Sequence, residues 1–160
     1  MPLELIPADY SHPMWPVLAP DLATDVHSES PYRLGEPTLR LPSTDRPENK
    51  RRFMVDPSDT SRILGITSFG INTLSTGSPL FITEVFIPRP IRGNSYGTRL
   101  MELTEQTASR LYVEHILLHA LERSVGFYLK MGYIVQSHTG GTGPFMIKSV
   151  SQSLSSSSSP

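Results

Sequence analysis

The sequence predicts an α+β domain in which helices pack on a mixed sheet. Three observations lead to this class. Apolar runs of strand length follow one another between residues 53 and 87, the apolar spacing becomes helical from residue 96, and short strands return after residue 112. The 160 residues are enough for one domain with its own core, which we place at residues 1–150.

The N-terminal third of the chain is rich in proline. Residues 3–6 fit an edge strand, but most of the 15 prolines precede residue 50 and interrupt any helical period. A turn or two of helix around Trp15 and Leu18 is all that this pattern predicts. We therefore expect residues 11–50 to form a largely irregular segment. At the other end, the serine-rich residues 151–160 predict a disordered tail.

Strands are expected at residues 53–55, 63–71 and 80–87. The first two are separated by a short turn and form a hairpin. The third is nearly all apolar, which is typical of a central strand that is covered on both faces. Pro88 and Pro90 end it, because neither can donate a backbone N–H.

An amphipathic helix is predicted to start at Tyr96, because the apolar residues that follow recur on one helical face and charged residues occupy the other. A glycine, Gly132, provides a C-terminal stop for a second, shorter helix. The elements expected after the first helix are a strand at residues 112–118, a helix at 124–131 and a hairpin formed by 133–135 and 144–147.

The composition excludes several classes of function. The chain has no cysteine, which excludes disulfides, Cys-ligated zinc, iron–sulfur clusters and a cysteine nucleophile. Its 14 basic and 15 acidic residues give a net charge of −1, so we expect no direct nucleic-acid partner. No apolar run is long enough for a membrane helix, and residues 1–10 lack the basic start of a signal peptide. We expect an intracellular, cytoplasmic protein; the basic residues 50–52 leave a nuclear location open.

A glycine-containing turn joins the predicted central strand to the amphipathic helix. It reads Arg92-Gly93-Asn94-Ser95-Tyr96-Gly97-Thr98. The start of a helix exposes unpaired N–H groups and the positive end of the macrodipole, so it attracts phosphate. Gly93 and Gly97 allow close backbone approach, and Arg92 adds positive charge. An ordinary strand-to-helix loop is the alternative. Neither the P-loop nor the dinucleotide fingerprint fits this spacing.

The turn is similar to the acyl-CoA turn of the GNAT N-acetyltransferase superfamily, [R/Q]-x-x-G-x-[G/A]. Arg92 and Gly97 take its first and last positions, and Ser95 stands where the family has its first glycine. A second family signature, roughly A-x-x-F-Y-x-K-x-G-F, resembles residues 124–133, which read Ser124-Val125-Gly126-Phe127-Tyr128-Leu129-Lys130-Met131-Gly132-Tyr133. The resemblance covers residues 53–148, and its wording is closest to the histone-acetylating branch.

The resemblance implies a mostly antiparallel sheet with a V-shaped split between two central parallel strands, at residues 80–87 and 112–118. In the family acetyl-CoA, as co-substrate, lies in this split, with its pantetheine arm along the first strand and its pyrophosphate on the turn. The residues expected to bind it are Val85, Phe86, Ile87, Arg92, Gly93, Asn94, Ser95, Tyr96, Gly97, Thr98 and Lys130.

The implied reaction is direct transfer of the acetyl group to an amine in a ternary complex. Tyr128 matches the tyrosine that protonates the departing thiolate in many family members. Glu84 is the one acidic residue of the predicted central strand and is the candidate general base. A carboxylate that faces solvent or pairs with an arginine is the alternative. The histone-acetylating branch has its base about three residues earlier, at Phe81, and regular alternation places Glu84 on the opposite face.

Other functions remain open from the sequence. The acceptor is a protein lysine, a protein N-terminus or a small amine. His115 and His119 are four residues apart but lie in a predicted strand without a third ligand, so no metal is expected. A degenerate acyl-CoA-binding module without turnover is one rival, motivated by Ser95. A protein-interaction module that works through the proline-rich segment and the serine tail is the other.

Overall fold

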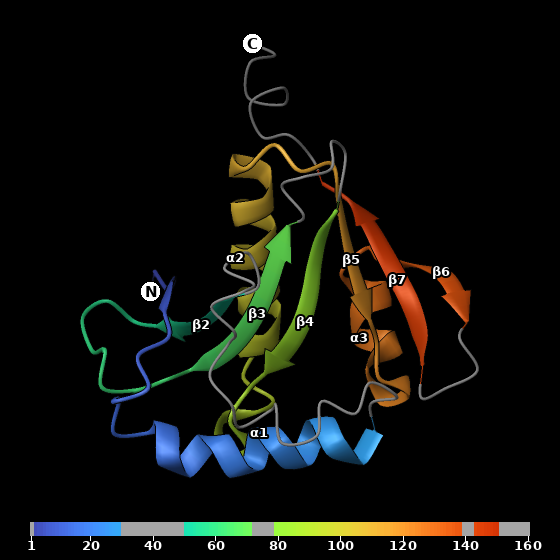
Figure 1. Cartoon of the computed structure of the whole chain (residues 1–160). Helices are drawn as coiled ribbons and strands as arrows, with labels where there is room; N and C mark the ends of the chain where they lie inside the picture. The colour runs from blue at the N-terminus through green and yellow to red at the C-terminus, as the bar shows by residue number, and fades with distance from the viewer. Residues whose placement is uncertain (1, 30–49, 72–78, 139–142, 151–160) are drawn as a thin grey trace.

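The computed structural model describes residues 2–29, 50–71, 79–138 and 143–150, which form three α-helices and a seven-stranded sheet (Figure 1). In chain order the strands and helices are β1 (Glu4–Pro7), α1 (Trp15–Glu29), β2 (Lys50–Val55), β3 (Gly65–Ile71), β4 (Leu80–Phe86), the 3-10 turn η2 (Arg89–Ile91), α2 (Tyr96–Arg110), β5 (His115–His119), the 3-10 turn η3 (Glu122–Ser124), α3 (Val125–Lys130), β6 (Ile134–His138) and β7 (Pro144–Ser149).

The sheet is mixed and mostly antiparallel, as predicted. Its strand order is β1-β2-β3-β4-β5-β7-β6, which puts β1 at an edge and β4 in the centre. Within this sheet the pairing of β4 with β5 is parallel and each other neighbouring pair is antiparallel. The two parallel strands are those that the sequence predicted at residues 80–87 and 112–118.

The two parallel strands are paired over only part of their length. The register runs from Leu80 opposite Ile116 to Ile82 opposite Leu118 and stops there. Strand β4 continues to Phe86, still paired with β3 on its other side. In Figure 1, β4 and β5 accordingly diverge toward the end of the sheet at which β4 finishes. The sheet therefore has a V-shaped split, as expected.

The two faces of the sheet carry different helices. On one face, α2 and α3 pack on β4, β5 and β7 through a cluster that includes Met101, Leu118 and Tyr128. On the other face, α1 packs on β2, β3 and the end of β4, with Trp15 and Phe86 in its cluster. We call these the α2 face and the α1 face. The helices α2 and α3 thus cover the two parallel strands on one face, while the described side chains of α1 reach only the end of β4 on the other.

Residues 11–50 were expected to be largely irregular, and this expectation is wrong for the part that forms α1, Trp15–Glu29. Pro16 lies in the first turn, where its missing N–H has no intrahelical partner to lose. Pro20 does interrupt the helix interior, at a cost of about 3 kcal/mol. Burial of side chains such as Trp15, Leu18 and Leu22, at about 1.5–3 kcal/mol each, offsets that cost. Residues 30–49 and the serine tail lie outside the described residues.

The bounds of several strands differ from those expected, and the starts of β2 and β5 differ most. Strand β2 starts at Lys50, three residues before the predicted start at residue 53, and pairs with both β1 and β3. Strand β5 starts at His115 because Tyr112 takes a positive φ of 58° and ends the turn after α2. In the part of the chain that the structure describes, no helix is long and apolar enough to cross a membrane.

Candidate active site

The turn after β4 places the start of α2 beside the open end of the split. Two residues reverse the chain with left-handed backbone, Gly93 with φ of 86° and Ser95 with φ of 66°. This region favours glycine, so the conformation at Ser95 explains why a glycine is usual at that position of the family pattern. The Ser95 side chain makes no capping hydrogen bond to the helix. Ser95 therefore adopts a left-handed backbone conformation that glycine adopts more readily.

The turn is positively charged and open to solvent. Helix α2 has no acidic residue in its first turn, so nothing there neutralises the positive end of its macrodipole. The Arg92 Nε donates a hydrogen bond to the Ile87 carbonyl oxygen at 2.7 Å, and its guanidinium lies 5.3 Å from the centre of the Phe86 ring. These contacts hold the Arg92 charge at the end of β4. Residues 92–95 are exposed.

Gly97 lies where the start of α2 contacts α3. A Cβ at this position would lie 3.5 Å from Cζ of Phe127 and 3.9 Å from Cγ1 of Ile87. Phe127, which precedes the candidate acid Tyr128, therefore packs on the turn. The two sequence signatures meet at this contact. A Cβ alone would make ordinary van der Waals contacts here, and a side chain longer than alanine would meet the Phe127 ring.

The other residues expected to bind acetyl-CoA surround this turn. The amide of Asn94 donates from Nδ2 to the Ile91 carbonyl oxygen at 3.0 Å. Tyr96 and Thr98, in the first turn of α2, are partly buried. Lys130 ends α3 with an exposed side chain. The structure brings the turn residues together. Lys130 lies at the C-terminal end of α3, the short helix that carries Tyr128.

Val85 and Phe86 lie on the open stretch of β4, and Ile87 directly follows it. Val85 and Phe86 pair with β3 in register with Thr67 and Ile66, while their other edge faces the split beyond the last β4–β5 pair. An edge of this kind presents backbone N–H and C=O groups to any extended ligand. Val85 and Ile87 pack toward α2, and Phe86 packs toward α1.

Tyr128 is buried in the cluster that joins α3 to β5. Its ring contacts Phe127, with centres 5.1 Å apart, and Tyr133, with centres 5.7 Å apart. Burial raises the pKa of the Tyr128 hydroxyl above its ordinary value of 10.0. The hydroxyl therefore keeps its proton throughout the neutral pH range, which is the state that a general acid requires.

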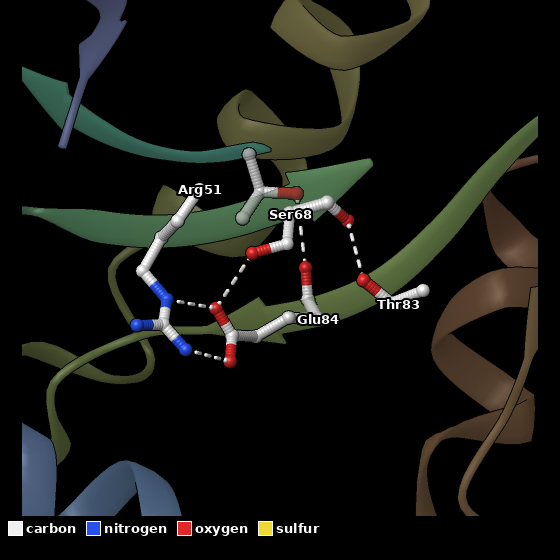
Figure 2. A network of polar contacts seen from close by, with 5 residues as sticks. Arg51, Ser68, Thr83 and Glu84 are labelled. Carbon is white, nitrogen blue, oxygen red and sulfur yellow. Dashed lines mark hydrogen bonds and ion pairs between the residues drawn. The ribbon is translucent and has the colours of Figure 1, made fainter. Parts of the chain in front are cut away.

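Glu84, the candidate base, is engaged in a buried ion pair. Its Oε1 and Oε2 accept hydrogen bonds from Arg51 Nε at 2.7 Å and Nη2 at 2.9 Å. Ser68 Oγ donates a third at 2.9 Å (Figure 2). A carboxylate held by an arginine is the alternative that the sequence left open. To accept a proton from an amine, Glu84 would have to give up these bonds, so the geometry argues against the base role.

His119 occupies a position that the sequence interpretation considered only for metal binding. It directly follows Leu118, the last residue of β5 that pairs with β4, and so lies where the two strands separate. Its ring meets that of Phe145 edge to face, with centres 4.9 Å apart, and Phe145 in turn meets Phe81. Burial lowers the pKa of His119, opposed by a hydrogen bond to the Gly143 backbone. The imidazole is therefore neutral at neutral pH.

His119 faces the α1 side of the sheet. His119 lies opposite Phe145 of β7 in the register of the two strands. The preceding pair, Leu118 and Met146, points into the cluster on the α2 face. Successive strand residues point to opposite faces. The sequence signal that could have found His119 is a titratable side chain at the end of the second parallel strand. The sequence interpretation considered its four-residue spacing from His115 only as the spacing of two metal ligands.

Two sequence comparisons bear on this site. A family model described as the acetyltransferase (GNAT) family matches residues 15–133, which is most of the chain. The match includes α1, the turn and α3. A search of curated proteins found no match.

Solved structures share the fold at low sequence identity. Tetrahymena GCN5 is 14% identical, with a TM-score of 0.67, and the alignment covers 95% of this chain and 98% of that one. PaiA N-acetyltransferase from Thermoplasma acidophilum, solved with coenzyme A, is 12% identical with a TM-score of 0.66 over 93% and 99% of the two chains. An aminoglycoside 6′-acetyltransferase type Ii is 18% identical, with a TM-score of 0.62 over 92% and 97%.

Proposed function

Because the chain belongs to the GNAT family of acetyltransferases, enzymes of acetyl-CoA-dependent acyl transfer, we propose that it moves the acetyl group directly to an amine in a ternary complex. The observation that carries the proposal is the split between β4 and β5, with the exposed turn before α2 at its open end. The amine belongs to a protein lysine, a protein N-terminus or a small molecule.

The split and the turn have complementary roles toward acetyl-CoA. The open edge of β4 at Val85, Phe86 and Ile87 supplies backbone groups that pair with the pantetheine arm. The exposed turn, with Arg92 and the unneutralised start of α2, supplies N–H donors and positive charge for the pyrophosphate. The solved PaiA relative with coenzyme A supports this ligand class. Lys130 is proposed as a further contact of the phosphate groups.

Tyr128 is proposed as the general acid. The amine nitrogen attacks the thioester carbonyl carbon, the C–S bond breaks, and the departing sulfur takes a proton from the Tyr128 hydroxyl. Two observations support this role. The hydroxyl is protonated at neutral pH, since its pKa lies above the ordinary value of 10.0. The ring is fixed by Phe127 and Tyr133 on either side, so its position costs no ordering at the moment of reaction.

His119 is proposed as the group that takes the proton from the amine, in place of Glu84. A base must lie near the reacting carbon and be unprotonated at the working pH. His119 meets the first condition by its place at the apex of the split and the second by its lowered pKa. The Glu84 carboxylate is instead occupied by its hydrogen bonds with Arg51 and Ser68, so it is not free to accept the proton.

The wall of the split on the α1 face suggests the kind of amine. Next to the apex of the split, on the last paired stretch of β4 and β5 and on β7, Phe81, Leu117 and Phe145 have partly exposed side chains, and Phe145 contacts both Phe81 and His119. Apolar and aromatic side chains of this kind contact the carbon chain of an acceptor rather than a highly charged group. We therefore propose that the amine is carried on an apolar or aromatic group.

The experiment that tests the function is release of CoA thiol from acetyl-CoA, with and without amine. The chain has no cysteine, so a thiol reagent reports only the product. We expect release that requires the amine, with one acetylated amine formed for each CoA. Release without amine, together with acetylated protein, would contradict direct transfer. A panel of an aliphatic amine, an arylalkylamine, a lysine peptide and a free N-terminal peptide then identifies the acceptor class.

A further inference from the structure

The split opens at an irregularity in β4. Ser68 of β3 lies opposite Glu84, but the next residue of β3, Phe69, lies opposite Ile82. Thr83 is therefore an extra residue in β4, which is a β-bulge. Ile82 is also the last residue of β4 that pairs with β5. The bulge and the end of the parallel pairing coincide.

The bulge changes which residues of β4 face each helix. Leu80 and Ile82 belong to the cluster on the α2 face, and Val85 also packs toward α2. Phe86 belongs to the cluster on the α1 face. Without the extra residue, Ile82 and Phe86 would share a face. The expectation that alternation places Glu84 opposite Phe81 is therefore wrong, because the bulge brings both to the α1 face.

Hydrogen bonds from side chains of β2, β3 and β4 hold this bulge in place (Figure 2). Arg51 of β2 binds the Glu84 carboxylate through Nε and Nη2, and Ser68 Oγ donates to Glu84 Oε1. Thr67 Oγ1 donates to the Glu84 carbonyl oxygen at 2.9 Å, and Thr83 Oγ1 donates to the Ser68 carbonyl oxygen at 3.3 Å. The bonds thus hold the side chain and the backbone of the residues that make the bulge.

The ion pair at the centre of the network is fully enclosed. The side chains of Arg51 and Glu84 are each 5% exposed. The Arg51 guanidinium also lies 5.0 Å from the Trp15 ring centre and 5.9 Å from that of Tyr10. A buried ion pair contributes little net stability compared with apolar residues of similar size, and its best-attested use is to fix one conformation. Here the ion pair joins β2 to the residue that follows the bulge, so the conformation that it would fix is the bulged register of β4.

We propose that Arg51 and Glu84 are positioning residues that hold the bulged register of β4 and, through it, the backbone groups of Val85 and Ile87 that bind acetyl-CoA. The inference rests on the proposed function. Loss of the bulge would shift the residues after Thr83 by one position, and such a slip turns every following side chain to the opposite face. The edge of β4 would then offer the pantetheine arm the wrong donors and acceptors.

A double substitution tests the proposal without leaving a buried charge unpaired. Arg51→Met with Glu84→Met replaces the pair by apolar side chains, which is often neutral for stability. We expect the double variant to unfold cooperatively near the melting temperature of the parent. Its Kd for CoA, measured by calorimetry, should rise about tenfold, the effect of one or two lost hydrogen bonds. The KM for acetyl-CoA should rise in parallel, with kcat changed less.

The control removes an ion pair of similar length that lies away from the split. Lys148 Nζ lies 2.9 Å from Glu105 Oε1, between β7 and α2. Lys148→Met with Glu105→Met should leave the Kd for CoA within about twofold of the parent. An Arg51→Met, Glu84→Met protein that binds CoA as tightly as the parent would overturn the proposal. A parent protein that binds no CoA would instead contradict the proposed function itself.

Discussion

Replacing Tyr128 by phenylalanine is expected to lower kcat by about 10²-fold while the Kd for CoA stays the same. The change removes one hydroxyl and keeps the ring that packs between Phe127 and Tyr133. Without the hydroxyl, the sulfur departs as an unprotonated thiolate, so the loss falls on the chemical step. Steady-state kinetics and calorimetry on the same sample separate the two effects.

Tyr133→Phe is the matched control for this prediction. Tyr133 is also a buried tyrosine, but its hydroxyl donates to Glu105 Oε2 at 3.3 Å. Its loss is expected to cost about 1 kcal/mol of stability and to leave kcat near the parent value. Equal losses of kcat in the two variants would show that the Tyr128 hydroxyl has no special role in the chemical step. Full activity of Tyr128→Phe would remove it from the mechanism.

Replacing His119 by asparagine is expected to lower kcat/KM by about 10²-fold, the usual contribution of a positioned base. The pH dependence gives a second readout. An imidazole accepts a proton only when it is neutral, so activity falls as pH drops through the pKa of His119. Burial lowers that pKa from its ordinary value of 6.5, and the acid limb is therefore expected below pH 6.5.

The acid limb should disappear in His119→Asn when the acceptor is a weakly basic amine, whose own protonation does not mask it. Glu84→Gln serves as the comparison, because it tests the residue that the sequence favoured. We expect Glu84→Gln to raise the KM for acetyl-CoA and to keep the acid limb. An acid limb that is retained in His119→Asn and lost in Glu84→Gln would restore Glu84 as the base.

Local sequence patterns predicted most of the elements that form the split. The nearly continuous apolar run from residue 80, the prolines after it and the helical period from Tyr96 place β4, the turn and α2 in their observed order. The φ values of Gly93 and Ser95 agree with a turn at this point. These features depend on residues close together in the chain, which is why the sequence shows them.

Long-range contacts could not be predicted in this way. Helix α1 forms in spite of Pro20 because Trp15 packs on Phe53, with ring centres 5.9 Å apart, a contact between residues far apart in sequence. The role of Glu84 depends on Arg51, 33 residues earlier in the chain. The bulge at Thr83 depends on the register with β3 and reversed the face inferred from alternation. Each of these interactions exists only once the sheet has assembled.

Thermal unfolding with and without CoA tests the central claim, that the turn and the open edge of β4 bind acetyl-CoA. A ligand at about 100 times its Kd stabilises the native state by about 2.7 kcal/mol, which corresponds to a rise in Tm of roughly 5–10 °C for a chain of this size. The account predicts such a rise with CoA and a much smaller one with pantetheine, which lacks the pyrophosphate. An unchanged Tm in millimolar CoA would contradict it.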